Sequence, residues 1–326
     1  MKLLAGICGG FPRPKELDDA LDALEAGKIS RETFVEIAER FLREVIRLQE
    51  NSGMDVLTSG LLTWRDPLEP FAAGLSGIEL GGLSRFFDTS LYYRRPIIAG
   101  KITWNKPIVL KEVQELEKHT SRLIKAVVPG PYTFLKLSEN LFYESADLLV
   151  DDLIEALKSE INMLGKVADF IQVDEPSLVD SELSRIDRLR GIDIVNELLT
   201  KVNIPEEKLI IATYFDLDIE KYSLLLDLRA GLHLDLTSKP YSAKEALSEY
   251  GYEGKLLSLG VIDSRSVYPV DPREIVYRIS KLLDKISADT LIFSTSSWLN
   301  YIPYHEAVRK LDALGRVLAE AEVRFG

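Results

Sequence analysis

The 326-residue sequence predicts an α/β fold, a single (β/α)8 TIM barrel, because short apolar runs alternate with amphipathic helical patterns along most of the chain. The apolar runs are rich in valine, isoleucine and leucine and mostly lack polar alternation, which is typical of parallel strands buried on both faces. Strands are expected at residues 3–8, 55–59, 125–129, 169–173, 208–213, 231–236, 255–262 and 290–295.

The helices expected between these strands are recognised by their apolar stripes. One begins near Lys15, and the others are expected at residues 31–50, 109–124, 145–166, 188–201, 242–250, 272–287 and 304–324. Two starts fit the long helix at 31–50: Ser30 as the N-cap, or Thr33 with Glu36 as a capping box. Asp271 followed by proline predicts the start of another helix.

The domain organisation is predicted to be simple. Residues 60–108 form the one long stretch without a regular pattern, rich in aromatic residues, glycine and proline, and we expect an irregular excursion after strand 2 that lies over the barrel mouth. No linker or low-complexity segment interrupts the pattern. We therefore expect one domain over residues 1–326.

Composition narrows the class of protein. The formal net charge of -12 argues against a nucleic-acid partner and against anionic membrane surfaces. Cys8 is the only cysteine, so no intramolecular disulfide can form, which fits a reducing cytosol. We see no signal peptide and no apolar segment of membrane-spanning length, and we expect a cytoplasmic protein.

Chemistry in such barrels lies at the carboxyl ends of the strands. The stretch IQVDEP places Asp174 and Glu175 there, and paired acids suit acid–base work or an amine ligand; alternatively, one caps the following helix and the other pairs with an arginine or a lysine. The other pocket candidates at strand ends are Tyr214, His233, Asp235, Asp263 and Ser296.

Three further features have a functional and a structural interpretation. His233 and Asp235 share one strand face and could bind a metal, but a lone strand histidine is more often a hydrogen-bonded core residue. Cys8 within an apolar strand favours a buried structural thiol. Arg13 and Lys15, beside the Gly9–Gly10 turn, suit an anionic group or are simply surface charge.

Together, these strand ends resemble a known family. The stretches that carry the resemblance, in chain order, are GFPRPKEL, LSRFFDTSLYY, VVPGPYTFL, FIQVDEPSLV, LIIATYFDLD, AGLHLDL, LLSLGVIDSRSVY and STSSWL. They resemble the N-terminal barrel of cobalamin-independent methionine synthase, from about residue 6 to the C-terminus. In that family a C-terminal barrel holds zinc and activates homocysteine, whereas the N-terminal barrel lacks the metal and helps to hold the folate's glutamate tail.

The resemblance implies no metal site in this chain. The family's catalytic half binds zinc through His, Cys, Glu and a second Cys, and these positions fall on Thr213, Phe215, near Asp235, and at or next to Ser296. Only Asp235 is a metal-ligating type, and a single cysteine cannot supply two thiolates. Zinc is therefore expected only in a partner chain.

The resemblance also implies an anion site for the folate or pterin tail. The family's basic turn after the first strand falls on Lys15 to Asp18, and a further basic position falls on Arg85. Arg13, Lys15 and Arg85 are thus the candidates for holding a reduced methyl-folate or methyl-pterin, although Asp18 disfavours a polyglutamate tail.

Three functions follow as hypotheses. The first is a zinc-free half of a split methionine synthase that works beside a separate zinc-bearing barrel in methyl transfer to homocysteine. The second is a free-standing, metal-independent acid–base enzyme related to uroporphyrinogen decarboxylase. The third is a non-enzymatic binding or scaffold barrel whose mouth is filled by its own 60–108 segment.

Overall fold

The parallel sheet of the computed structural model, which describes residues 1–238 and 242–325, follows the order of a (β/α)8 barrel. Neighbouring strands in that order are β1 (Lys2–Ala5), β11 (Ile286–Thr295), β10 (Tyr252–Ile262), β9 (Gly231–Asp235), β8 (Leu209–Thr213), β7 (Phe170–Asp174), β5 (Leu123–Pro129) and β2 (Val56–Leu57). The backbone N–H of Asp55 donates to the carbonyl of Ala5 at 2.8 Å, which joins the two ends of the sheet. The predicted fold is confirmed.

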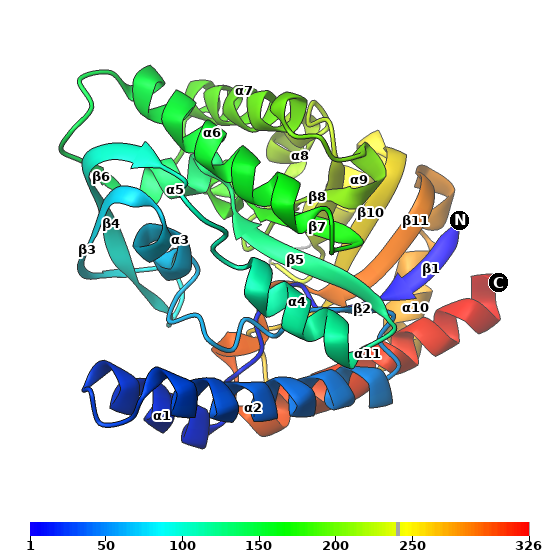
Figure 1. Cartoon of the computed structure of the whole chain (residues 1–326). Coiled ribbons are helices and arrows are strands. Elements are labelled where there is room, and N and C mark those ends of the chain that lie inside the picture. The colour runs from blue at the N-terminus through cyan, green and yellow to red at the C-terminus, as the bar shows by residue number, and fades with distance from the viewer. Residues whose placement is uncertain (239–241, 326) are drawn as a thin grey trace.

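Helices cover the outside of the barrel (Figure 1). They are α1 (Lys15–Glu25), α2 (Arg31–Asn51), α3 (Glu69–Gly74), α4 (Leu110–His119), α5 (Pro131–Leu137), α6 (Ala146–Leu164), α7 (Arg185–Lys201), α8 (Ile219–Leu225), α9 (Ser242–Tyr250), α10 (Pro272–Ser280) and α11 (Tyr304–Phe325). The short helices α3, α5 and α8 were not expected from the sequence, because six or seven residues are too few to show a helical period.

Two predicted helices were too long. The helix expected at 109–124 ends at His119, and the one expected at 272–287 ends at Ser280. In both cases the apolar residues that seemed to extend the helical stripe belong to the approach to the next strand, which begins at Leu123 in one case and Ile286 in the other. The helix starts were better defined: the Ser30 hydroxyl accepts the N–H of Thr33, and the Asp271 carboxylate accepts that of Arg273.

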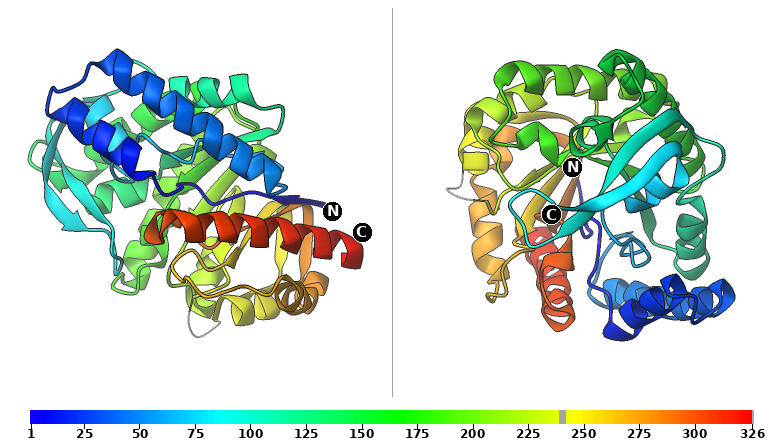
Figure 2. Two further views of the ribbon diagram at one scale, coloured as in Figure 1. Left: turned by 90° about the horizontal axis from the view of Figure 1, so that it is seen from below. Right: turned by 90° about the vertical axis from the view of Figure 1, so that its left-hand side faces the viewer.

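The segment after β2 was wrongly expected to be irregular. It contains α3 and two long strands, β3 (Ser76–Arg85) and β4 (Tyr92–Thr103), which pair antiparallel and are joined by β6 (Glu139–Asn140) in a separate three-stranded sheet. Glycines and a register shift between Leu80 and Leu83 interrupt the alternation that identifies a strand. Figures 1 and 2 place this sheet at the end of the barrel opposite the two chain termini.

The first strand is shorter than expected, since β1 ends at Ala5 and the chain continues as extended backbone. Cys8 lies beyond the strand but has no exposed surface, which agrees with the structural interpretation of this thiol. Within the part of the chain that the structure describes, no helix has both the length and the apolar character needed to span a bilayer.

Candidate functional site

Asp174 is the centre of the buried polar network at the barrel mouth. It is the last residue of β7, and its Oδ1 accepts from Gln172 Nε2 at 2.7 Å. Its Oδ2 accepts from the Tyr214 hydroxyl at 3.1 Å and from Trp298 Nε1 at 2.9 Å. Burial raises the pKa of Asp174 to about 6. The structure thus joins two predicted residues, Asp174 and Tyr214, to a tryptophan that the prediction did not include.

A second layer lies below this carboxylate inside the barrel. Lys125 Nζ donates to Gln172 Oε1 at 2.7 Å and to the carbonyl of Ile7 at 2.8 Å, and Gln172 Nε2 lies 3.6 Å from Cys8 Sγ. Burial lowers the pKa of Lys125. Sequence analysis missed Lys125 and Gln172, although each is a polar residue within an otherwise apolar strand, which is the signal that could have identified them.

Glu175 caps α5, a helix that precedes it in the chain, and not the following helix that the structural interpretation of the acid pair predicted. Its carboxylate accepts from the backbone N–H groups of Tyr132 and Thr133 at 2.9 and 2.8 Å, and from the Thr133 hydroxyl at 2.7 Å, at the first turn of α5. The close approach requires glycine at position 130, where a Cβ would lie 2.1 Å from the Glu175 carboxyl carbon. Burial raises the pKa of Glu175 to about 7.

His233 lies on β9 as a hydrogen-bonded core residue. Its Nε2 lies 3.2 Å from the carbonyl oxygen of Ser296, which can only accept, so this nitrogen carries the proton and Nδ1 accepts from the Ser258 hydroxyl at 2.8 Å. Burial lowers the pKa of His233 to about 3, so the imidazole is neutral. Both ring nitrogens are therefore engaged with the protein's own groups.

Asp235 holds the loop that follows its strand. Its Oδ1 accepts from the backbone N–H and hydroxyl of Thr237 at 2.7 and 2.8 Å and from the N–H of Ser238 at 3.2 Å, while Oδ2 accepts from the N–H of Phe215 at 3.4 Å. Phe215 has a φ of 93°, a conformation that non-glycine residues rarely adopt. The Asp235 carboxylate and the surrounding rings hold this strained residue in place.

The last two pocket candidates lie apart from the Asp174 network. The Ser296 hydroxyl is 3.0 Å from that of Ser264 in a buried serine cluster. Asp263 accepts from the backbone N–H of Arg265 at 2.9 Å and lines a cleft between the end of β10 and α10. The barrel therefore brings Asp174 and Tyr214 together, whereas Asp263 lies on the wall of another cavity.

The family's zinc does not fit the residues at these positions. The Thr213 hydroxyl donates to the carbonyl of His233 at 3.2 Å, Phe215 has no ligating atom, and the Asp235 carboxylate already accepts four hydrogen bonds. A soft zinc site needs thiolates, and the sole cysteine, Cys8, lies in the segment that follows β1. Within residues 1–238 and 242–325, no group of three His, Cys, Asp or Glu side chains is arranged to hold a metal ion.

The mouth is closed by aromatic side chains. Trp64 and Phe86 come from the segment that crosses the barrel end, and their rings pack edge-on against Trp298 at 6.0 Å and Phe215 at 6.5 Å between centroids. The cavity that remains beside Asp174 is about 10 Å³, roughly enough for one water molecule, so this carboxylate has no room for a substrate beside it. A separate cleft of about 570 Å³ is lined by Tyr214, Phe215 and Pro176 and does not include Asp174.

Each predicted anion-binding residue is paired with an acid of its own. Arg13 Nε donates to Asp18 at 2.5 Å, Lys15 Nζ to Asp19 at 2.7 Å, and the Arg85 guanidinium lies 3.1 Å from Asp88. Arg13 also donates to the carbonyl of Trp64 at 2.5 Å, which attaches the strand-1 turn to the segment over the mouth.

Fold and site together define the class: a parallel (β/α)8 barrel whose polar groups meet at the strand carboxyl ends beneath an aromatic cover. Residues 70–287 match the family model described as the N-terminal domain of cobalamin-independent synthase. The chain is 31% identical over 313 residues to a methionine synthase of Saccharolobus islandicus, covering 94% of this chain and 90% of the relative. The chain belongs to the cobalamin-independent methionine synthase family, as its motifs indicated.

Other similar proteins agree. A methionine synthase of Sulfurisphaera tokodaii is 29% identical over 316 residues, covering 94% of this chain and 88% of the relative. Among solved structures, the B12-independent methionine synthase of Shewanella sp. W3-18-1, in complex with selenomethionine, superposes with a TM-score of 0.80 at 19% identity, covering 99% of this chain and 98% of that one. A putative vitamin-B12-independent methionine synthase of Listeria monocytogenes gives 0.76 at 17%, covering 100% and 98%. These two structures share the fold.

Proposed function

We propose that this chain acts in methionine biosynthesis, in methyl transfer from a reduced methyl-folate or methyl-pterin to homocysteine, as the zinc-free barrel beside a separate zinc-bearing catalytic chain in the cytosol. Family membership supports the pathway. The relatives are themselves about one barrel long, since the chain covers 88–90% of them, so a single barrel is an ordinary size among these proteins.

The assignment of zinc to a partner chain is supported by the side chains that this barrel has at the four positions of the family's zinc ligands. The four positions that correspond to the family's zinc ligands offer one carboxylate, two hydroxyls and a phenyl ring, and the carboxylate of Asp235 is already saturated by its own loop. Homocysteine activation needs a metal-bound thiolate. The activating metal would then belong to a partner, and this barrel would contribute binding surface.

The experiment measures methyl transfer from methyltetrahydrofolate to homocysteine with three samples: this chain with added zinc, a zinc-bearing methionine synthase barrel from the same organism, and an equimolar mixture. We expect no turnover by this chain, and a mixture that exceeds the partner alone. Turnover by this chain, or one tightly bound zinc per chain lost in a His233→Ala or Asp235→Asn variant, would overturn the proposal.

A binding or scaffold barrel is the second candidate, and the closed mouth favours it. The side chains of Trp64, Phe86 and Trp298 cover the mouth and leave a cavity of about 10 Å³ beside Asp174. If the equimolar mixture forms a stable complex in analytical ultracentrifugation but its turnover equals that of the partner alone, the scaffold function replaces the first proposal.

A further inference from the structure

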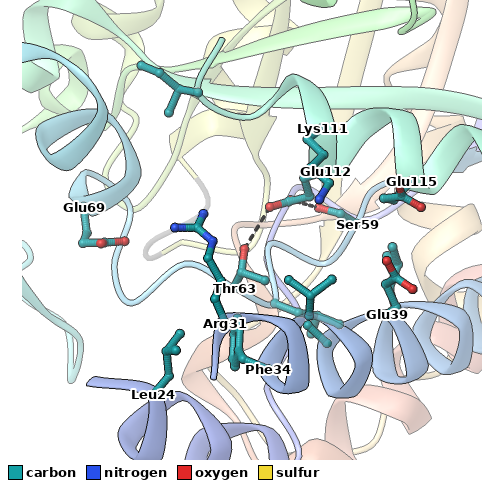
Figure 3. A pocket seen from close by; sticks show the side chains of 15 residues that line it. Leu24, Arg31, Phe34, Glu39, Ser59, Thr63, Glu69, Lys111, Glu112 and Glu115 are labelled. Carbon is teal, nitrogen blue, oxygen red and sulfur yellow. Dashed lines mark hydrogen bonds between the residues drawn. The ribbon is translucent and has the colours of Figure 1, made fainter. Parts of the chain in front are cut away.

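A cleft of about 410 Å³ lies on the flank of the barrel, away from the Asp174 network (Figure 3). Its walls are α2, α4 and the segment of residues 59–69, and we call it the α2–α4 cleft. This volume is within the range of small-molecule sites. None of the family motifs described above lies in it.

The floor of the α2–α4 cleft is apolar. Phe34 and Leu42 come from α2, Leu62 from the crossing segment and Ile108 from the approach to α4. Phe34, Leu42 and Leu62 are buried and Ile108 is partly buried, and all four side chains pack in the hydrophobic core. A ligand seated here would place an aliphatic group on this floor.

Glu112 is one of four acids that line the cleft, the others being Glu39, Glu69 and Glu115. Its carboxylate accepts from the Thr63 hydroxyl at 3.0 Å, from Trp64 Nε1 at 3.1 Å and from the Ser59 hydroxyl. All three donors are neutral, and in the described part of the chain no cation lies within ion-pair distance of Glu112. Burial of the carboxyl group raises its pKa. A cation brought by a ligand would supply the missing counter-charge.

Two cations lie at the rim. Arg31 begins α2 and Lys111 lies in the first turn of α4, and both are exposed. Neither forms a salt bridge with any residue of 1–238 or 242–325. Of the other acids in the lining, Glu39 lies 3.9 Å from Arg43 and Glu115 lies 2.6 Å from Lys118, whereas Glu69, like Glu112, has no ion-pair partner among the described residues. Figure 3 shows Arg31, Lys111 and Glu112 around the same opening. Charges of both signs thus border one apolar floor.

We propose that the α2–α4 cleft binds a free α-amino acid with an apolar side chain. The ligand's ammonium group would face Glu112, its carboxylate would face Arg31 and Lys111, and its side chain would rest on Phe34, Leu62 and Ile108. A zwitterion pairs with both signs of charge in the cleft at once. A simple carboxylate pairs only with the cations and is repelled by Glu112, and a simple amine pairs only with Glu112 and is repelled by the cations.

The cleft is connected to the barrel mouth through one side chain. Trp64 donates to Glu112 on the cleft side, and its ring packs at 6.0 Å from that of Trp298, which donates to Asp174. A ligand that draws the Glu112 carboxylate toward its ammonium group would therefore change the surroundings of Trp64. Tryptophan fluorescence is an internal reporter of occupancy.

The test is calorimetric titration of the full chain with L-leucine, with tryptophan fluorescence as a second readout. The matched half-ligands are 4-methylpentanoate, which lacks the ammonium group, and 3-methylbutylamine, which lacks the carboxylate. We expect saturable binding of L-leucine with a dissociation constant of about 1 mM or tighter, and at least about tenfold weaker binding of either half-ligand. No heat at about 20 mM leucine, or equal binding of 4-methylpentanoate, would overturn the proposal.

Variants locate the site. Arg31→Met and Lys111→Met change exposed side chains and should each weaken leucine binding about tenfold, because a charge-assisted contact is lost. Lys2→Met, an exposed lysine on β1, is the matched control and should bind as the unaltered chain does. Binding that is equally strong in all three variants would place the leucine elsewhere and overturn the assignment. Because no step uses the barrel mouth, this outcome is independent of the proposed methyl transfer.

Discussion

The barrel mouth and the α2–α4 cleft both hold hydrogen-bonded carboxyl groups next to apolar surface, but the two regions differ in their cations and in the space beside those groups. At the mouth, Asp174, Glu175 and Asp235 accept hydrogen bonds from the protein on all sides and lie under aromatic rings. At the cleft, Arg31 and Lys111 lack ion-pair partners among the described residues, and about 410 Å³ is open. The family motifs thus coincide with a closed network of internal hydrogen bonds around Asp174, whereas the cations without ion-pair partners border an open cleft.

At the barrel mouth, the substitution expected to lower the free energy of unfolding most is Gly130→Ala. In Gly130→Ala the new Cβ would lie 2.1 Å from the Glu175 carboxyl, so the carboxylate must leave the first turn of α5 while it stays buried. We expect a loss of about 4 kcal/mol in the free energy of unfolding, measured by urea denaturation. Gly82→Ala, where no heavy atom lies within 4 Å of the new Cβ, is the control and should change stability by less than about 0.5 kcal/mol. Equal losses of unfolding free energy in the two variants would show that the contact between Glu175 and α5 does not stabilise the fold.

The buried acids of the mouth should also make stability fall with rising pH. The folded-state pKa values of Asp174 and Glu175, about 6 and about 7, lie above the values of 3.8 and 4.5 that these side chains have in an unfolded chain, so the native state binds more protons than the unfolded state. Their contribution is present below the unfolded values and is lost as the pH rises through the folded ones. We expect the free energy of unfolding to drop by about 3 kcal/mol between pH 5 and pH 7. A flat or rising profile in urea titrations would contradict the raised values.

Two tryptophan substitutions, one in each region, compare how strongly a hydrogen bond to a buried carboxylate stabilises the mouth and the cleft. Trp298→Phe removes a donor from Asp174, which is 4% exposed and has room beside it for about one water molecule at most, and should cost about 2 kcal/mol. Trp64→Phe removes a donor from Glu112, which borders the open cleft, so water can replace the bond and the cost should be about 1 kcal/mol. Thermal melts of both variants give the order, and a larger loss for Trp64→Phe would mean that the cleft side is the more tightly enclosed.

The smallest expected effect concerns α2, one wall of the cleft. Ser30→Ala removes the hydroxyl that accepts from the N–H of Thr33, and we expect a loss of about 1 kcal/mol. Thr33→Ala tests the alternative capping box and should cost less, because the structure gives the N-cap role to Ser30. If Thr33→Ala proves the more damaging in urea denaturation, the helix begins later than residue 31 in solution.

The fold could be predicted because barrel strands are buried on both faces and therefore appear as uninterrupted apolar runs. The predicted strand at 231–236, for example, is β9 at Gly231–Asp235. The three-stranded sheet over the mouth could not, since Gly81 and Gly82 interrupt its alternation and its partner β6 has only two residues.

For the site, sequence indicated which residues reach the strand ends but not what they touch. Asp174 and Glu175 are adjacent in the chain, yet one faces Trp298 and the other caps α5. Those partners are 124 and 42 residues away, and no local pattern specifies them. The α2–α4 cleft was invisible for the same reason: Arg31 and Lys111 are ordinary first-turn residues until folding places their helices side by side.

The rate at which Cys8 is alkylated reports how often the barrel opens. The only thiol of the chain has no exposed surface and touches Gln172 under the closed mouth, and burial raises its pKa, so alkylating reagents meet neither an accessible sulfur nor a thiolate. Every labelling event must therefore wait for an opening of the barrel. The labelling rate as a function of urea separates brief local breathing of the mouth, which is insensitive to denaturant, from complete unfolding, which is steeply dependent on it.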